Sequence, residues 1–181
     1  MLIAEGNVEA FHDGVRLQAA RVTYAQEGGS LKIEGPIRIE DGGDTIILAS
    51  YAELDRELQD GLLTGARMVL QQQMQLAALQ MKRVNGRFSQ LYKTSVTSCQ
   101  VCGDKPPLWQ IRAAKVTHDQ REKQLYFEEA QLRVLGVPVF YLPAIRLPDP
   151  SLERSTGFLV PSVQSTSNLG TGVKTPYFIT L

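Results

Sequence analysis

Hydrophobic and polar residues alternate along much of this 181-residue chain. Alternation is clearest at 31–39, where Leu31, Ile33, Ile37 and Ile39 are apolar and most of the residues between them are polar. A period of two gives a β-strand one apolar and one polar face. Polar turns containing Gly, Asn and Asp separate such segments, so the pattern predicts consecutive antiparallel strands.

A unit of about thirty residues, strand–turn–strand, recurs along the chain. Aligning its alanines gives steps of 30, 29 and 35 residues, and the longer last step contains the segment 99–107. Segment 68–81 also has a spacing compatible with a helix, but the repeat register favours strands there. The aligned alanines are Ala19, Ala49, Ala78 and Ala113.

Single hairpins cannot bury their apolar faces, so neighbouring units must cover one another. We therefore expect an all-β fold, a jelly-roll or solenoid of repeated antiparallel hairpins whose two sheets face each other across an apolar interior. Two interpretations stay open at this point. The interior is either a closed core, which is the norm for sandwiches, or a space between splayed sheets that takes an apolar ligand.

Composition narrows the functional classes. Lys+Arg and Asp+Glu balance at 19 each and no nucleic-acid-binding motif is present, so no nucleic-acid partner is expected. The longest apolar run, 134–145, is broken by Pro138 and Pro143 and is too short for a transmembrane helix. The first residues do not form a signal peptide; if the protein is exported, we expect its signal peptide to have been removed.

Catalysis has little support in the sequence. There is no G-x-S-x-G motif and no glycine-rich phosphate loop. Glu128 and Glu129 are adjacent, so alternation predicts that they point to opposite faces. His118 takes the place of Tyr24 in the repeat and is expected to be structural. We predict a protein that is not an enzyme and that uses no cofactor.

The two cysteines, Cys99 and Cys102, form a lone CxxC motif. Such a motif fits a redox pair, half of a zinc site, or structural cysteines of an exported protein. His12 and His118 are not spaced as zinc ligands, and a loop rather than a helix follows the pair. We therefore expect neither a metal site nor catalytic redox chemistry.

The end of the chain predicts a β-hairpin, with strands at 157–165 and 170–181. Pro161 and Pro176 each remove a ladder hydrogen bond from one strand. Segment 146–154 contains two prolines and is typical of a linker. The expected organisation is a jelly-roll over 1–145, a linker over 146–156 and the hairpin over 157–181.

Several ordered motifs resemble the LptD family of outer-membrane lipopolysaccharide-assembly proteins. They are Tyr92–Cys99, Trp109–Asp119, Leu135–Pro143 and Ser155–Ser162. The resemblance implies a periplasmic β-jelly-roll in a Gram-negative outer-membrane protein. Such a domain receives lipopolysaccharide from an LptA-type bridge protein by edge-strand stacking and passes it to a β-barrel plugged by the lipoprotein LptE.

The resemblance also favours the splayed interior, which would carry the acyl chains. The positions expected to line it are Val22, Tyr24, Leu31, Ile33, Ile37, Leu54, Leu63, Met68, Phe88, Val116, Leu125 and Phe127.

Three further roles follow from the resemblance. The final hairpin would be the first two strands of a truncated outer-membrane barrel, with Pro161 and Pro176 at a lateral gate. Cys99 matches a position that forms a disulfide with the barrel's C-terminal region, although pairing with Cys102 stays open. The alternatives are a bridge or adaptor jelly-roll of the same transport system, a structural β-solenoid and a CxxC oxidoreductase.

Overall fold

The computed structural model describes residues 1–25, 28–41, 45–98, 106–151, 157–158, 162–166, 170–174 and 177–178. They belong to two compact units, Met1–Ser151 and Leu152–Leu181. Pro161, Pro176, Cys99 and Cys102 lie outside the described residues, so the predicted gate and disulfide stay predictions. No helix in the described part of the chain is long and apolar enough to cross a membrane.

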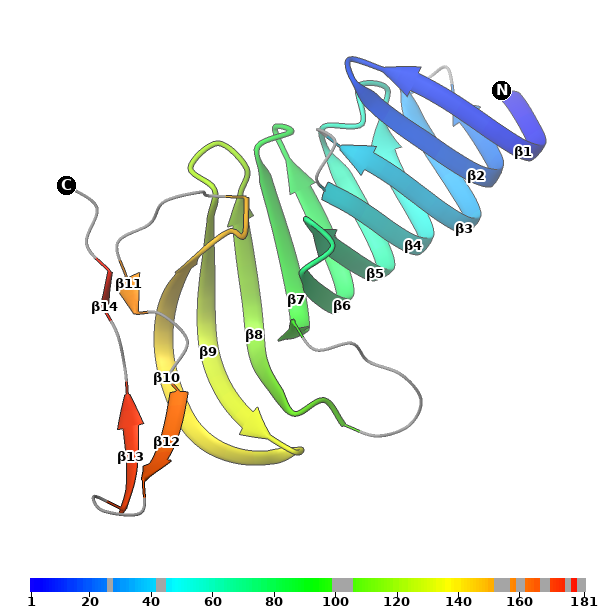
Figure 1. Cartoon of the computed structure of the whole chain (residues 1–181). Coiled ribbons are helices and arrows are strands. Elements are labelled where there is room, and N and C mark those ends of the chain that lie inside the picture. Colours follow the sequence, from blue (N-terminus) through cyan, green and yellow to red (C-terminus); the bar gives the residue numbers. More distant parts are fainter. Residues whose placement is uncertain are drawn as a thin grey trace. The chain divides into compact units, whose positions relative to one another are not determined.

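The first unit is a ten-stranded antiparallel sheet in which each strand pairs with its neighbours in sequence (Figure 1). The predicted all-β class and the repeated antiparallel hairpins are confirmed. Segment 68–81 belongs to two strands joined by a short turn, as the repeat register indicated. The strands are β1 (Leu2–His12), β2 (Val15–Ala25), β3 (Ser30–Asp41), β4 (Thr45–Asp55), β5 (Gly61–Leu70), β6 (Met74–Val84), β7 (Phe88–Thr97), β8 (Trp109–Asp119), β9 (Gln124–Val134) and β10 (Val137–Pro148).

The two facing layers are the two halves of this one sheet. Gln120, directly after β8, donates from Nε2 to Oδ2 of Asp41 at the end of β3, over 3.1 Å. In a flat sheet, strands five places apart would be separated by about 24 Å. The sheet therefore curls until the two rows of strand ends, which we call its long edges, meet. The two halves of the curled sheet, its walls, enclose the apolar side chains between them.

The curl coincides with a break in the middle of the strands. Near its middle, each odd-numbered strand has one residue with a left-handed backbone, and the pairing register shifts beside two of them, Gly6 and Gly35. The alanines of the sequence repeat lie on the even-numbered strands at the same level and are 6–8% exposed. These mid-strand left-handed residues are Gly6, Gly35, Gly65, Lys93 and Glu129.

Small inward side chains suit this line because the two walls converge there. We call it the bend line, made of the left-handed residues just named and the inward-facing Ala19, Ala49, Ala66, Ala78, Ala113 and Ala130. The thirty-residue repeat is therefore the spacing of successive bends.

The described residues of the second unit form four short strands in two antiparallel pairs, β12 with β13 and β11 with β14. Thr166 pairs with Gly170, and Gly157 pairs with Phe178. The organisation into a jelly-roll, a linker and a hairpin stays a prediction. The strands are β11 (Gly157–Phe158), β12 (Ser162–Thr166), β13 (Gly170–Lys174) and β14 (Tyr177–Phe178).

Candidate functional site: an apolar interior with a polar mouth

A continuous apolar cluster runs from β2 to β9 between the two walls. It is made by the inward-facing residue of each alternating pair, and both halves of the strands contribute. Eight predicted lining residues are at most 2% exposed within it: Ile33, Ile37, Leu54, Leu63, Met68, Val116, Leu125 and Phe127.

Four predicted residues lie elsewhere. Val22 and Leu31 are half-buried and pack against the edge of the cluster. Tyr24 is half-buried, with the Arg56 guanidinium 6.0 Å from its ring. Phe88 is the exception to the inward placement: Ser89 and Leu91, which follow it in β7, are buried, so alternation turns Phe88 outward.

Phe88 also contacts its neighbour in sequence. Its ring lies 4.7 Å from the guanidinium carbon of Arg87, a cation–π contact. The first residue of β7 therefore lies on the polar face, whereas the sequence repeat predicted it on the inward face.

The apolar interior is uncovered at both edge strands. Ala10 of β1 pairs with the buried Leu17, yet it is exposed, and Leu2 on the same face is 61% exposed. At the other edge Phe140 of β10 pairs with Leu132 of β9 and is 59% exposed. The apolar track thus continues to both ends of the sheet, where each edge strand pairs on one side only among the described strands.

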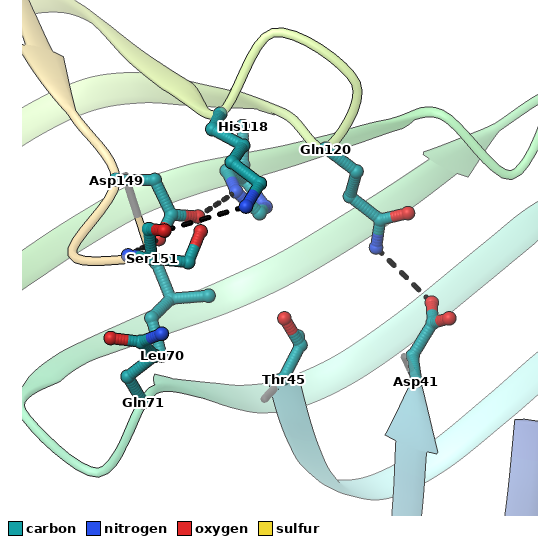
Figure 2. Close-up of a pocket in the computed structure, with 9 residues that line it drawn as sticks. Asp41, Thr45, Leu70, Gln71, His118, Gln120, Asp149 and Ser151 are labelled. Atoms are coloured by element: carbon teal, nitrogen blue, oxygen red, sulfur yellow. Dashed lines mark hydrogen bonds and ion pairs between the residues drawn. The ribbon is translucent and has the colours of Figure 1, made fainter. Parts of the chain in front are cut away.

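A polar pocket of about 190 Å³ lies where the two long edges of the sheet meet, which we call the mouth. Figure 2 shows His118 and Asp149 directed toward each other and Gln120 directed toward Asp41. One edge contributes the ends of β3, β4 and β5, and the other the β8–β9 turn and the residues after β10. The pocket is lined by Asp41, Thr45, Leu70, Gln71, His118, Gln120, Lys123, Asp149 and Ser151.

An ion pair crosses the mouth. Nη2 of Arg83, near the end of β6, lies 2.6 Å from Oδ2 of Asp41, and the two side chains are 3% and 15% exposed. The same carboxylate oxygen accepts from Gln120. Asp41 thus joins the end of β3 to the end of β6 and to the β8–β9 turn on the opposite edge. The other terminal nitrogen of Arg83, Nη1, is buried and has no hydrogen-bond partner among the described residues.

A second buried contact holds the segment that leaves β10. Nε2 of His118 lies 2.5 Å from Oδ2 of Asp149, and both side chains are almost inaccessible to solvent. Burial alone would raise the pKa of Asp149, but hydrogen bonds from His118 and the backbone N–H of Ser151 outweigh it and hold that pKa below its usual value. His118 therefore contributes to the structure by binding Asp149, in line with the structural role expected for it.

Hydrogen bonds also connect the neighbouring turns along this edge of the sheet. Asp119 accepts from Arg87, with an Nη2–Oδ2 distance of 2.5 Å. The backbone N–H of Gln120 donates to Arg87 O, and that of Asp149 donates to Lys123 O. These bonds tie the β6–β7 turn, the β8–β9 turn and the end of β10 into one edge.

The mouth does not have the geometry of a nucleophilic site within the part of the chain that the structure describes. A catalytic His uses one ring nitrogen for its carboxylate and the other for the nucleophile. In His118, Nδ1 is buried and lacks a described partner. No group of three or more potential metal ligands occurs among the described residues either. What the arrangement offers chemically is an apolar interior with charged groups at its opening.

The mouth contacts could not be read from the sequence. Asp149 lies in the segment expected to be a linker, and Asp41 is the last residue of an ordinary strand. The contacts join residues 31, 42 and 79 positions apart. The only signal was His118, a titratable residue at an apolar position of the repeat.

Comparison with known proteins identifies relatives of this chain by sequence. No protein-family model matches the chain. The LPS-assembly protein LptD of Nitrosococcus oceani is 31% identical over 177 residues, 97% of this chain and 23% of that protein. LptD of Vibrio vulnificus is 28% identical over 97% of this chain and 22% of its own length. LptD of Pseudomonas putida is 28% identical over 100% of this chain and 18% of its own length.

One solved structure is also similar. It is LptH of Pseudomonas aeruginosa, described as the LptA homologous periplasmic component of the lipopolysaccharide transport device. The TM-score is 0.46 at 14% identity, with 75% of this chain and 95% of that chain covered. A likeness at this level is too weak to support a conclusion about function.

The chain spans about a fifth of the length of the curated relatives it matches. Its similarity to them extends over nearly all of its own residues, including both the apolar interior and the mouth. The resemblance that the sequence motifs predicted is thereby confirmed: this chain is similar, over almost its whole length, to a segment of the LPS-assembly protein LptD.

Proposed function

We propose that this chain is the lipid-receiving part of a lipopolysaccharide-assembly protein and that it acts by binding and transfer, without turnover chemistry. The observation that carries the proposal is the apolar interior, continuous through the sheet and uncovered at both edge strands. Sequence similarity to LptD supplies the class of ligand.

The physical basis is the chemistry of an amphipathic lipid. Each CH₂ group moved from water into an apolar interior contributes about 0.8 kcal/mol, so acyl chains gain from any continuous apolar track. A track without fixed polar anchors also lets a chain slide along it. The sugars and phosphates would stay in water outside the mouth, beside its charged side chains. The apolar positions that Val22, Leu31 and the eight buried residues occupy are proposed to contact the acyl chains.

The free edges indicate where partners would bind. The chain leads from β10 to the second unit, whereas the outer side of β1 has no pairing partner among the described strands and its inward face is exposed. An LptA-type bridge protein is proposed to add its edge strand to β1, so that the two apolar interiors join.

The remaining predictions concern the whole protein. We propose that 1–145 is the periplasmic jelly-roll, 146–156 a linker and 157–181 the start of an outer-membrane barrel that receives LptE. Pro161 and Pro176 would lie at its lateral gate. Cys99 would form a disulfide with the barrel's C-terminal region, with Cys102 as the alternative partner.

Photocrosslinking to purified lipopolysaccharide tests the proposal. Phe127→p-benzoylphenylalanine places the probe inside, and Tyr126→p-benzoylphenylalanine is the matched control, because the adjacent aromatic residue faces outward on the same strand. We expect lipid adducts from position 127 and few from position 126. Adducts only from position 126 would favour a structural β-solenoid instead.

A further inference from the structure

The interior of the first unit is filled by its own side chains. Eight of the proposed lining residues are at most 2% exposed, because side chains of the two walls pack against each other. An acyl chain of the proposed ligand therefore reaches them only if the walls separate. The question is what keeps the walls together and where they turn.

The bend line has the properties of a hinge. Each odd-numbered strand has a left-handed residue there, and the inward side chains at that level are mostly alanines, with Thr94 on β7. Left-handed residues interrupt the ladder, and small side chains leave little packing to be lost when the angle between the walls changes. Both features confine bending to this line.

The contacts across the mouth lie at the opposite side of the walls from the bend line. Asp41 holds Arg83 at 2.6 Å and Gln120 at 3.1 Å, and thus joins the two long edges of the sheet. Arg83 is almost completely buried, and Nη1 has no described partner, so its charge is compensated by Asp41. A buried ion pair of this kind is costly to break by removing one partner, which is the property a closure needs.

We propose that Asp41, Arg83 and Gln120 form a latch that closes the mouth, and that the walls open about the bend line to admit an acyl chain. The inference rests on the proposed function and assigns these three residues a role in loading. The latch is released whenever Asp41 moves away from the opposite edge, and the lipid enters sideways along the mouth.

Locking the latch tests this inference. The variant Asp41→Cys/Gln120→Cys is prepared in the 181-residue chain with Cys99→Ser, Cys102→Ser and Phe127→p-benzoylphenylalanine. Dibromobimane, a short reagent with two thiol-reactive arms, then bridges the mouth. Monobromobimane modifies the same thiols without joining them. We expect lipopolysaccharide adducts at position 127 in the singly modified protein and loss of most of them in the bridged protein.

Two further variants make the result specific. Thr23→Cys/Lys32→Cys bridges a directly paired position of β2 and β3 away from the mouth and should leave the adducts unchanged. Thr45→Cys/Gln120→Cys bridges the same pocket but keeps the Arg83–Asp41 pair, so it provides the test if replacement of Asp41 unfolds the chain.

The outcomes separate the latch from the function. Unchanged adducts in the protein bridged across the mouth would overturn the latch and leave the proposed function standing. Absence of adducts in every sample, including the singly modified protein, would overturn the proposed function and the latch with it.

Discussion

Two threonines of β7 show how one hydroxyl changes stability according to its partner. Thr94 is 1% exposed and its Oγ1 has no described hydrogen-bond partner, whereas Thr97 donates from Oγ1 to Trp109 O over 2.7 Å. A buried unpaired polar group costs roughly 1–3 kcal/mol. Thr94→Val should therefore raise the free energy of unfolding, and Thr97→Val should lower it. Urea denaturation measures both, and shifts of the same sign would contradict the assignment.

The carboxylate of Asp119 makes stability depend on pH. Its hydrogen bonds from Arg87, Arg121 and Glu122 hold its pKa below the usual 3.8, against the effect of burial. As the pH falls, the unfolded chain binds the proton first, so this stabilisation is complete above about pH 4 and is lost below it.

Asp119→Asn should accordingly lower stability at neutral pH and flatten the decline in acid, as measured by the free energy of unfolding between about pH 7 and about pH 2. The exposed Asp13→Asn, in the β1–β2 turn, is the control. If both variants have the acid dependence of the parent protein, the buried carboxylate has no special role.

At the scale of the strand, the bend depends on particular glycines. Gly35 has φ +84°, and a Cβ there would lie 2.6 Å from Cβ of Ala20. Gly6 has φ +105°, but a Cβ added there would meet no atom within 4 Å. Left-handed backbone costs an L-residue about 1–2 kcal/mol, so Gly6→Ala should lose about that much and Gly35→Ala more.

The steric part of the Gly35→Ala cost should be recovered by adding Ala20→Gly, which removes the clashing methyl group. Thermal denaturation of the single and double variants measures this. A double variant less stable than Gly35→Ala would show that the close approach to Ala20 is not the cause.

At the scale of the whole molecule, the two edges of the sheet should be energetically coupled through Arg83 and Asp41. Removing either partner leaves a buried charge, with an expected cost of about 3–5 kcal/mol, whereas the double variant Arg83→Met/Asp41→Leu should cost much less than the sum. A double-mutant cycle measures the coupling. The exposed pair Lys115–Glu128, 2.9 Å apart, is the control and should couple by less than about 1 kcal/mol. Equal coupling in both pairs would argue against a buried closure.

Much of the element structure was predictable, because alternation and turns are local properties. The repeat even marked the bend line through Ala19, Ala49, Ala78 and Ala113, although its meaning as a bend was not apparent. Local irregularities were the first failures. Glu128 and Glu129 were expected on opposite faces, yet both are exposed, because Glu129 has φ +52° and interrupts the alternation. Phe88 was misplaced for a different reason: alternation is regular there, but the repeat does not fix the face of a strand's first residue.

The amino-acid sequence by itself therefore determines the strands, the turns, the thirty-residue period and the likeness to the LptD family. All of these depend on residues that are close in sequence. The mouth is different. Whether Asp41 meets Gln120, and whether His118 meets Asp149, depends on how far ten strands curl, and curvature accumulates over the whole sheet. Only the tertiary structure brings these turns together, because strand periodicity specifies which face a residue occupies but not which distant edge it will reach.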